Sequence, residues 1–178
     1  MSTGDFSNAF NSMSKLTVSE FNHPNVNNMS YTYYGCSKLT GSPVCGNNVT
    51  NMYNTYYNCY NLTGSPVCGP NVTGMSYTYF NCIKLTGNPT CGPNVINMSN
   101  TYWSCYRLTG RPVCGDKVTD MSRAYYNCYK LTGNPVCGDN ITDMSYTYYE
   151  CDSFGCEASY TEYLPLAVPT PKQNPPLQ

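Results

Sequence analysis

A 23-residue unit repeats along most of the chain, and this period constrains the fold more than any other feature of the sequence. Five columns keep the same phase: a cysteine, a leucine, a valine or isoleucine, a methionine and an aromatic residue. The cysteines of the first column are Cys36, Cys59, Cys82, Cys105, Cys128 and Cys151. One unit of this length cannot bury its apolar residues alone, so each unit must pack on the next. The period therefore predicts a repeat solenoid.

Within each unit, the order of residues predicts two walls. The Leu-Thr-Gly segment with the following Pro-x-Cys is expected to form one short strand per coil, in a parallel sheet whose coils lie about 4.8 Å apart. Glycines such as Gly46 and Gly69 then turn the chain. The Val-x-x-Met-x-x-x-Tyr spacing that follows fits one face of a short helical or 3₁₀ turn on the opposite wall. The expected class is a leucine-rich-repeat-like solenoid.

The repeat also predicts the domain boundaries. Residues 1–28 form a degenerate N-terminal capping repeat, in which Met13 and Leu16 take the positions of the first cysteine and the leucine. Residues 29–155 form the solenoid. Residues 156–178 form an extended C-terminal arm, since proline cannot continue a strand ladder. We expect this arm to contact neighbours in an assembly through its prolines, Pro165, Pro169, Pro171, Pro175 and Pro176.

Residues 48–64 read N-V-T-N-M-Y-N-T-Y-Y-N-C-Y-N-L-T-G, and this unit resembles the BspA-like leucine-rich repeats of bacterial surface proteins and bacteriophage structural proteins. The resemblance spans nearly the whole array. The chain departs from the family by placing Thr-Tyr where Ala-Phe or Met-Phe is usual, and by adding a second cysteine to each repeat. The resemblance implies an adhesion or partner-binding scaffold without transferable catalytic residues.

Charge and composition narrow the classes of partner that we expect for this chain. Only 11% of the residues are charged and the formal net charge is -1, so the sequence gives no reason to expect nucleic acid or an anionic membrane as partner. The N-terminus lacks a signal-peptide pattern, and no apolar stretch approaches the ~18 residues of a membrane span. We therefore expect a virion or cytoplasmic assembly. A trimmed precursor would instead place the chain at the cell surface.

Eleven of the twelve cysteines fall in two columns of the repeat. The first column is expected to be buried, where a free thiol behaves as a small hydrophobe. A disulfide requires Cα atoms within about 7 Å, which leaves the pairing of the second column open. Because no C-x-x-C occurs and the only histidine, His23, lies outside the cysteine grid, we expect no metal site of the zinc type and no cofactor. The second column consists of Cys45, Cys68, Cys91, Cys114 and Cys137.

Two rows of charge are candidate binding features. The position two residues after the first cysteine is basic in five coils, which would form a stripe that attracts an acidic partner surface. The alternative is a solvated edge that blocks unwanted strand pairing. In the acidic C-terminal part, Asp116 stacks over Asp139 and Asp120 over Asp143, as two possible cation pairs or as part of an acidic docking end. The basic row consists of Lys15, Lys38, Lys84, Arg107 and Lys130.

Tyrosine doublets such as Tyr33-Tyr34 and Tyr56-Tyr57 recur with the period. We expect one ring of each doublet to face the core and the other to lie at the wall. Rows of exposed tyrosines suit contact with protein or carbohydrate, although the rings can equally pack between coils.

The sequence as a whole favours a non-catalytic structural or binding protein. We expect a repeat scaffold in a larger assembly such as a phage or virus particle, with protein partners that include copies of itself or a capsid or tail protein. The alternative is a bacterial cell-surface adhesin or receptor module that binds host protein or glycan. Because no Ser-His-Asp set, phosphate-binding loop or acid/base pair stands out from the repeat, we expect no enzymatic activity and no catalytic residues.

Overall fold

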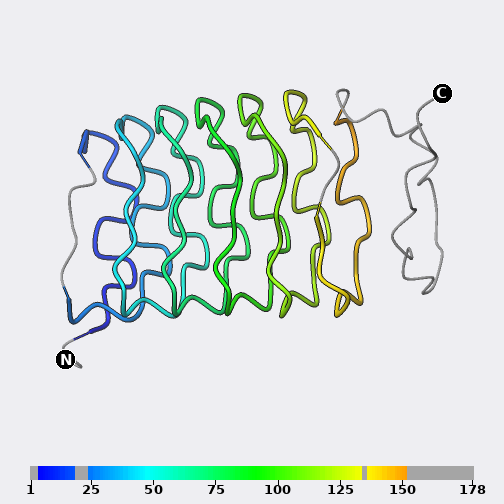
Figure 1. Cartoon of the computed structure of the whole chain (residues 1–178). Coiled ribbons are helices and arrows are strands. Elements are labelled where there is room, and N and C mark those ends of the chain that lie inside the picture. The colour runs from blue at the N-terminus through cyan, green and yellow to red at the C-terminus, as the bar shows by residue number, and fades with distance from the viewer. Residues whose placement is uncertain (1–3, 19–23, 134–135, 152–178) are drawn as a thin grey trace, which may run out of the picture.

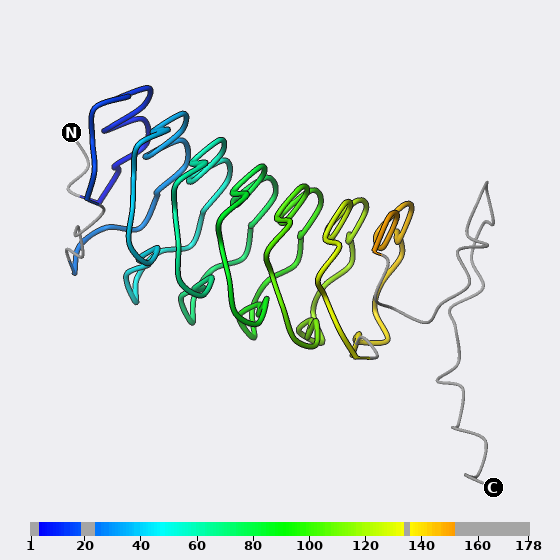
Figure 2. The same cartoon turned by 90° about the horizontal axis from the view of Figure 1, so that it is seen from above.

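In the computed structural model, which describes residues 4–18, 24–133 and 136–151, the chain winds through successive coils that lie side by side along one axis (Figures 1 and 2). Equivalent positions of neighbouring coils are 23 residues apart in the sequence, as in the parallel bridge between Asn28 and Asn51. The colour in Figure 1 runs from one end of the row of coils to the other, so neighbours in sequence are also neighbours in space.

Backbone pairing between coils consists of isolated parallel bridges, and no residue of the described ranges belongs to a helix or to a longer strand. The most regular run of bridges precedes the methionine column. The expected class, with a short strand in each coil and helical or 3₁₀ turns opposite, stays a prediction. The bridged residues of this run are Asp5, Asn28, Asn51, Gly74, Asn97, Asp120 and Asp143.

The wall that follows each methionine is built from consecutive turns. The N–H of Tyr33 donates to the carbonyl of Thr55 in the next coil at 2.9 Å, whereas the N–H of Thr32 donates to the carbonyl of Met29 in its own coil at 3.0 Å. Hydrogen bonds between coils thus alternate with hydrogen bonds that close local turns. A left-handed backbone at Tyr31, with φ of 57°, separates successive turns and prevents the chain from continuing as a helix.

The core lies inside the coils and is formed by the five columns of the repeat. Val49, Met52, Tyr56, Cys59 and Leu62 are fully buried in one coil, and the equivalent residues of the neighbouring coils join the same hydrophobic cluster. The predicted burial of the first cysteine column is therefore confirmed. In the N-terminal coil, the aromatic and leucine positions are only partly buried, since no further described coil covers them.

A row of buried threonines links each coil to the coil before it. The hydroxyl of Thr55 lies 2.8 Å from the carbonyl of Met52 in its own coil and 2.8 Å from that of Met29 in the preceding coil. Every described coil from residue 29 onward except one has this arrangement, and in the exception Ala124 takes the threonine position. We call these residues the threonine row: Thr32, Thr55, Thr78, Thr101 and Thr147.

The first cysteine column makes a second link in the same direction. The thiol of Cys59 donates to the carbonyl of Tyr33 in the preceding coil at 3.1 Å, and the same bond recurs at 3.0 Å from Cys105 to Tyr79. These thiols satisfy buried carbonyl groups as well as filling space in the core.

Candidate binding surface

One tyrosine of each doublet belongs to the core. Neighbouring rings in this inner aromatic row stack face to face, as in Tyr56 and Tyr79, whose centroids are 5.4 Å apart with an interplanar angle of 2°. The hydroxyl of Tyr79 donates to the carbonyl of Val67 at 2.7 Å and accepts from its N–H at 3.1 Å. Burial raises the pKa of Tyr79 well above its ordinary value. The inner aromatic row consists of Phe10, Tyr33, Tyr56, Tyr79, Tyr102, Tyr125 and Tyr148.

The second ring of each doublet lies at the wall, so the predicted division of the doublets is confirmed. Tyr34 and Tyr57 are partly exposed, and their centroids are 4.7 Å apart with an interplanar angle of 9°. This outer aromatic row crosses six coils. Its members are Tyr34, Tyr57, Phe80, Trp103, Tyr126 and Tyr149.

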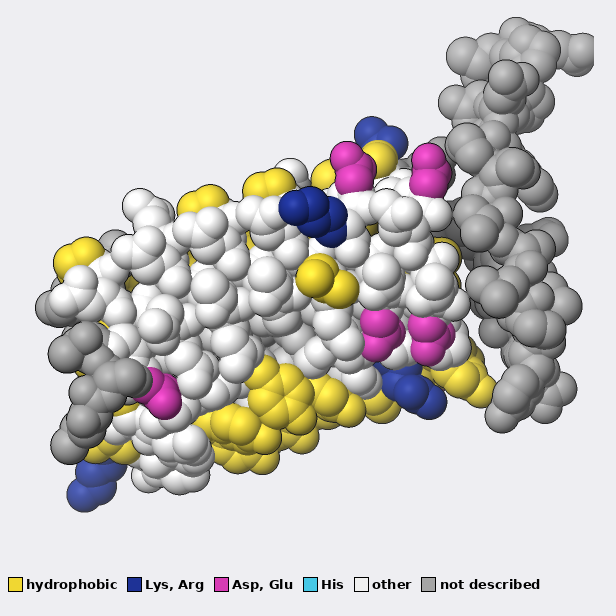
Figure 3. All heavy atoms as spheres, turned by 90° about the horizontal axis from the view of Figure 1, so that it is seen from below, with side chains coloured by type: hydrophobic (Ala, Val, Ile, Leu, Met, Phe, Trp, Pro, Cys, Tyr) yellow, Lys and Arg dark blue, Asp and Glu magenta, His cyan; other side chains and the backbone are white. Residues whose placement is uncertain are grey.

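Further aromatic rings widen the outer row. The ring of Tyr53 lies edge-on to those of Tyr31 and Tyr77, with centroid distances of 5.4 and 6.2 Å. The ring centroid of Tyr146 lies 6.0 Å from that of Tyr149, and the guanidinium carbon of Arg123 lies 5.1 Å from the Tyr146 centroid in a cation–π contact. Figure 3 shows a strip of hydrophobic side chains along one edge of a face that is otherwise mostly uncharged and polar. Exposed apolar strips of this kind are a common feature of interaction surfaces.

The basic row predicted from the sequence lies on the surface. All five side chains are exposed, and the ammonium group of Lys84 donates to the side-chain carbonyl of Asn61 in the preceding coil at 2.6 Å. Asn61 is the one residue that interrupts the row. The row therefore follows the coils from one to the next.

One of the two acidic pairs, Asp120 and Asp143, has a local structural role. Asp120 and Asp143 form a parallel bridge, and a carboxylate oxygen of each accepts the N–H two residues later, from Ser122 at 2.9 Å and from Ser145 at 2.8 Å. The side chain of Asn97 accepts from Ser99 in the same way at 2.8 Å. The aspartates thus replace asparagine in a turn that either residue can form.

Asp116 and Asp139 are exposed, and acidic side chains gather toward the C-terminal end of the face in Figure 3. Within the described residues, no three histidine, cysteine or acidic side chains are grouped so as to hold a metal ion. The proline-rich arm, with all five of its prolines from Pro165 to Pro176, lies outside the described residues.

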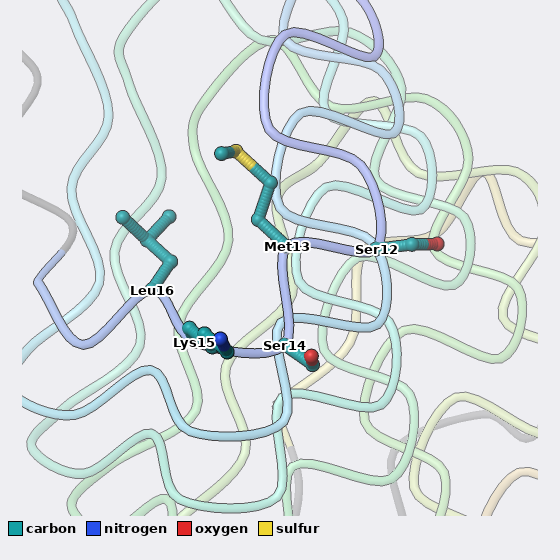
Figure 4. A pocket seen from close by; sticks show the side chains of 5 residues that line it. All are labelled: Ser12, Met13, Ser14, Lys15 and Leu16. Carbon is teal, nitrogen blue, oxygen red and sulfur yellow. The ribbon is translucent and has the colours of Figure 1, made fainter.

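A shallow hollow at the N-terminal coil is lined by residues 12–16. Figure 4 shows Met13 and Leu16 pointing to the inner side of the coil and Ser12 pointing away from it. The side chain of Met13 is 49% exposed, so the hollow is the open end of the core and not an enclosed pocket. The described part of the chain also contains no helix with the length and apolar character needed to cross a membrane.

Two features were missed by the sequence reasoning. The threonine row precedes the tyrosine doublet in nearly every repeat, and this regularity was a signal that the residue is buried. The left-handed positions had a weaker signal, because unlike residues such as Tyr31, Asn54 and Arg123 occupy the equivalent position in different coils.

A family model described as "Mycoplasma protein of unknown function, DUF285" matches residues 4–102, more than half of the 178-residue chain. No curated protein and no solved structure matches the chain.

Proposed function

The chain belongs to the DUF285 family, for which no function is known, and we propose from its surface that it is a non-catalytic scaffold that binds a protein partner in a larger assembly. The outer aromatic row is the observation that carries this proposal. The resemblance of the repeat to BspA-like leucine-rich repeats supports it, as does the predicted solenoid class.

The orientation of the rings favours protein over carbohydrate. Tyr57 and Phe80 stack with centroids 4.5 Å apart and an interplanar angle of 3°, so each ring covers a face of its neighbour. A sugar ring packs flat on an open aromatic face, and such faces are already occupied along most of this row. The edges and hydroxyl groups remain available, and they suit the mixed apolar and hydrogen-bonding contacts of protein interfaces.

Trp103 is the expected centre of the contact. Its ring is tilted by 54° from Phe80 and by 32° from Tyr126, so it breaks the regular stack near the middle of the row. Tryptophan and tyrosine are the residue types that most often dominate binding energy when they lie centrally in an interface. Replacing Trp103 by alanine is therefore expected to weaken binding by about 2 kcal/mol, or roughly 30-fold in Kd.

The proposal is tested by photocrosslinking in cells that produce the protein. A photoreactive amino acid is placed at Tyr57 or Tyr126 in the outer aromatic row, and at Ile96 as the matched control. Ile96 is 47% exposed but does not belong to the row. We expect one protein to be captured from both row positions and not from Ile96, with capture reduced by excess unlabelled protein. Equal capture from all three positions, or none from any, would overturn the proposal.

A further inference from the structure

The second cysteine column contains one pair that differs from the others. The thiols of Cys45, Cys68 and Cys91 donate to the carbonyl of the glycine that follows each of them, at 3.7, 3.6 and 3.4 Å. The sulfur of Cys114 instead lies 4.0 Å from the sulfur of Cys137 in the next coil. The local thiol–carbonyl bond of the repeat is thus replaced by a contact between two thiols.

The backbone holds the two cysteines at this distance. The N–H of Cys114 donates to the carbonyl of Val136 at 2.9 Å, and the N–H of Val136 donates to the carbonyl of Pro112 at 3.0 Å. Val113 and Val136, the residues before the two cysteines, form a parallel bridge. Adjacent parallel chains lie about 4.8 Å apart, within the range of about 4.4–6.8 Å that separates the Cα atoms of disulfide-bonded cysteines.

The two thiols differ in exposure and in acidity. Cys137 is partly exposed, whereas Cys114 is only 5% exposed. The pKa of the Cys137 thiol is lowered, because the Cys114 thiol and the Tyr148 hydroxyl, 3.6 Å away, stabilise its thiolate by hydrogen bonding. The same contact with Cys137, together with burial, raises the pKa of Cys114. An accessible thiolate beside a second thiol is the arrangement found at oxidation-sensitive cysteines.

We propose that Cys114 and Cys137 form a covalent modification site, at which a peroxide converts the two thiols into a disulfide between adjacent coils. The Cys137 thiolate attacks one peroxide oxygen and becomes a sulfenic acid, while the other oxygen leaves as hydroxide and takes up a proton to become water. The Cys114 sulfur then attacks the sulfenic sulfur, loses its proton, and displaces the second oxygen as water. Two electrons pass from the pair of sulfurs to the peroxide, which is reduced to two waters.

The inner cysteines provide the contrast within the same chain. The thiol of Cys128 is fully buried and donates to the carbonyl of Tyr102 at 3.0 Å, and burial raises its pKa well above the ordinary value. Such a thiol has neither the access nor the thiolate character that reaction with peroxide requires. We expect the proposed site to react before any cysteine of the first column.

The experiment exposes the full chain to hydrogen peroxide, alkylates the remaining thiols under denaturing, non-reducing conditions, and maps the linked peptides by mass spectrometry. We expect a Cys114–Cys137 linkage to form at least about ten times faster than oxidation of Cys45, whose pKa burial raises to about 11. Cys114→Ser should leave a sulfenic acid at Cys137 that a dimedone probe traps. Cys137→Ser should leave Cys114 reduced.

Cys68→Ser is the matched control from the same column, because its thiol bonds to the Gly69 carbonyl and not to the pair, and it should form the linkage at the unchanged rate. Circular dichroism of each variant is used to check that the coils remain folded. The proposal is overturned if the folded protein forms no Cys114–Cys137 linkage, or if the second column is oxidised evenly. Because the readout is a linkage within the chain, it is independent of the proposed protein partner.

Discussion

Replacing Thr78 by valine should lower the free energy of unfolding by about 1 kcal/mol, although valine has nearly the same shape. The hydroxyl of Thr78 is buried and lies 2.7 Å from both the Met52 and the Met75 carbonyls. A single hydroxyl hydrogen serves both acceptors, so the loss corresponds to one neutral hydrogen bond. Each carbonyl keeps a backbone donor, at 3.1 Å from Thr55 and 3.0 Å from Thr78, which limits the cost.

Ala124 allows the reverse experiment in the same protein. It is fully buried at the threonine position of its coil, so Ala124→Thr would add a hydroxyl near the carbonyls of Met98 and Met121. Because five other coils accommodate threonine at this position, we expect the variant to raise the free energy of unfolding by about 0.5–1.5 kcal/mol.

Urea unfolding followed by circular dichroism measures both changes. With a slope of about 1–3 kcal/mol per molar urea, a change of about 1 kcal/mol moves the midpoint by roughly 0.3–1 M. Thr63→Val is the matched control, since Thr63 is exposed and its hydroxyl lies 3.4 Å from the Gly41 carbonyl. If Thr78→Val shifts the midpoint no more than Thr63→Val, and Ala124→Thr is destabilising, the threonine row does not stabilise the stack.

Three further predictions rest on single residues. Tyr79→Phe should cost about 1–2 kcal/mol because it removes both hydrogen bonds to the Val67 backbone. Tyr125→Phe should change stability by less than about 0.5 kcal/mol, because its buried hydroxyl has no hydrogen-bond partner among the described residues; urea midpoints compare the two variants. Gly64→Ala should cost about 1–2 kcal/mol, because Gly64 has a left-handed φ of 80° that alanine adopts only with strain. Gly74→Ala should be tolerated, since the nearest atom to the added Cβ is Oδ1 of Asn51 at 3.8 Å; an equal loss of thermal stability in the two variants would contradict this. Since the native pKa of Tyr79 is raised above the unfolded value near 10, its contribution to stability should be constant below about pH 10 and fall above it by about 1.4 kcal/mol per pH unit. This fall adds to the one that buried thiols such as Cys128 cause from about pH 8.5, so a urea midpoint that declines no more steeply above pH 10 than below it would refute the assignment to tyrosine.

The core could be predicted from the sequence because each of its columns contains one kind of side chain. Leu62, Met75 and Cys82 are buried as their columns indicate, and the division of each tyrosine doublet follows from the same argument. The chain path between the columns was less predictable. Left-handed positions are occupied by residues as different as Tyr77 and Arg123, so no single residue type marks them.

Differences between repeats were harder still to predict. Val67 and Val113 occupy equivalent positions, yet Val67 pairs with a tyrosine hydroxyl while Val113 forms a bridge with Val136. With this change, the Tyr125 hydroxyl has no hydrogen bond to any described residue, and Cys114 lies close to Cys137. The residues of the candidate disulfide site were therefore visible in the sequence, but their pairing depends on a local backbone arrangement that the repeat does not encode.

The direction of the side-chain bonds has a consequence for how the gene can change in length. The hydroxyl of Thr55 and the thiol of Cys59 both reach toward the preceding coil, whereas the N–H of Tyr33 reaches toward the following one. Every coil thus presents one kind of edge on each side, and any two whole units fit together. Unequal recombination that adds or removes 23 codons would join edges that already match, while the gain or loss of a single codon would put the columns out of register within the coil that contains it.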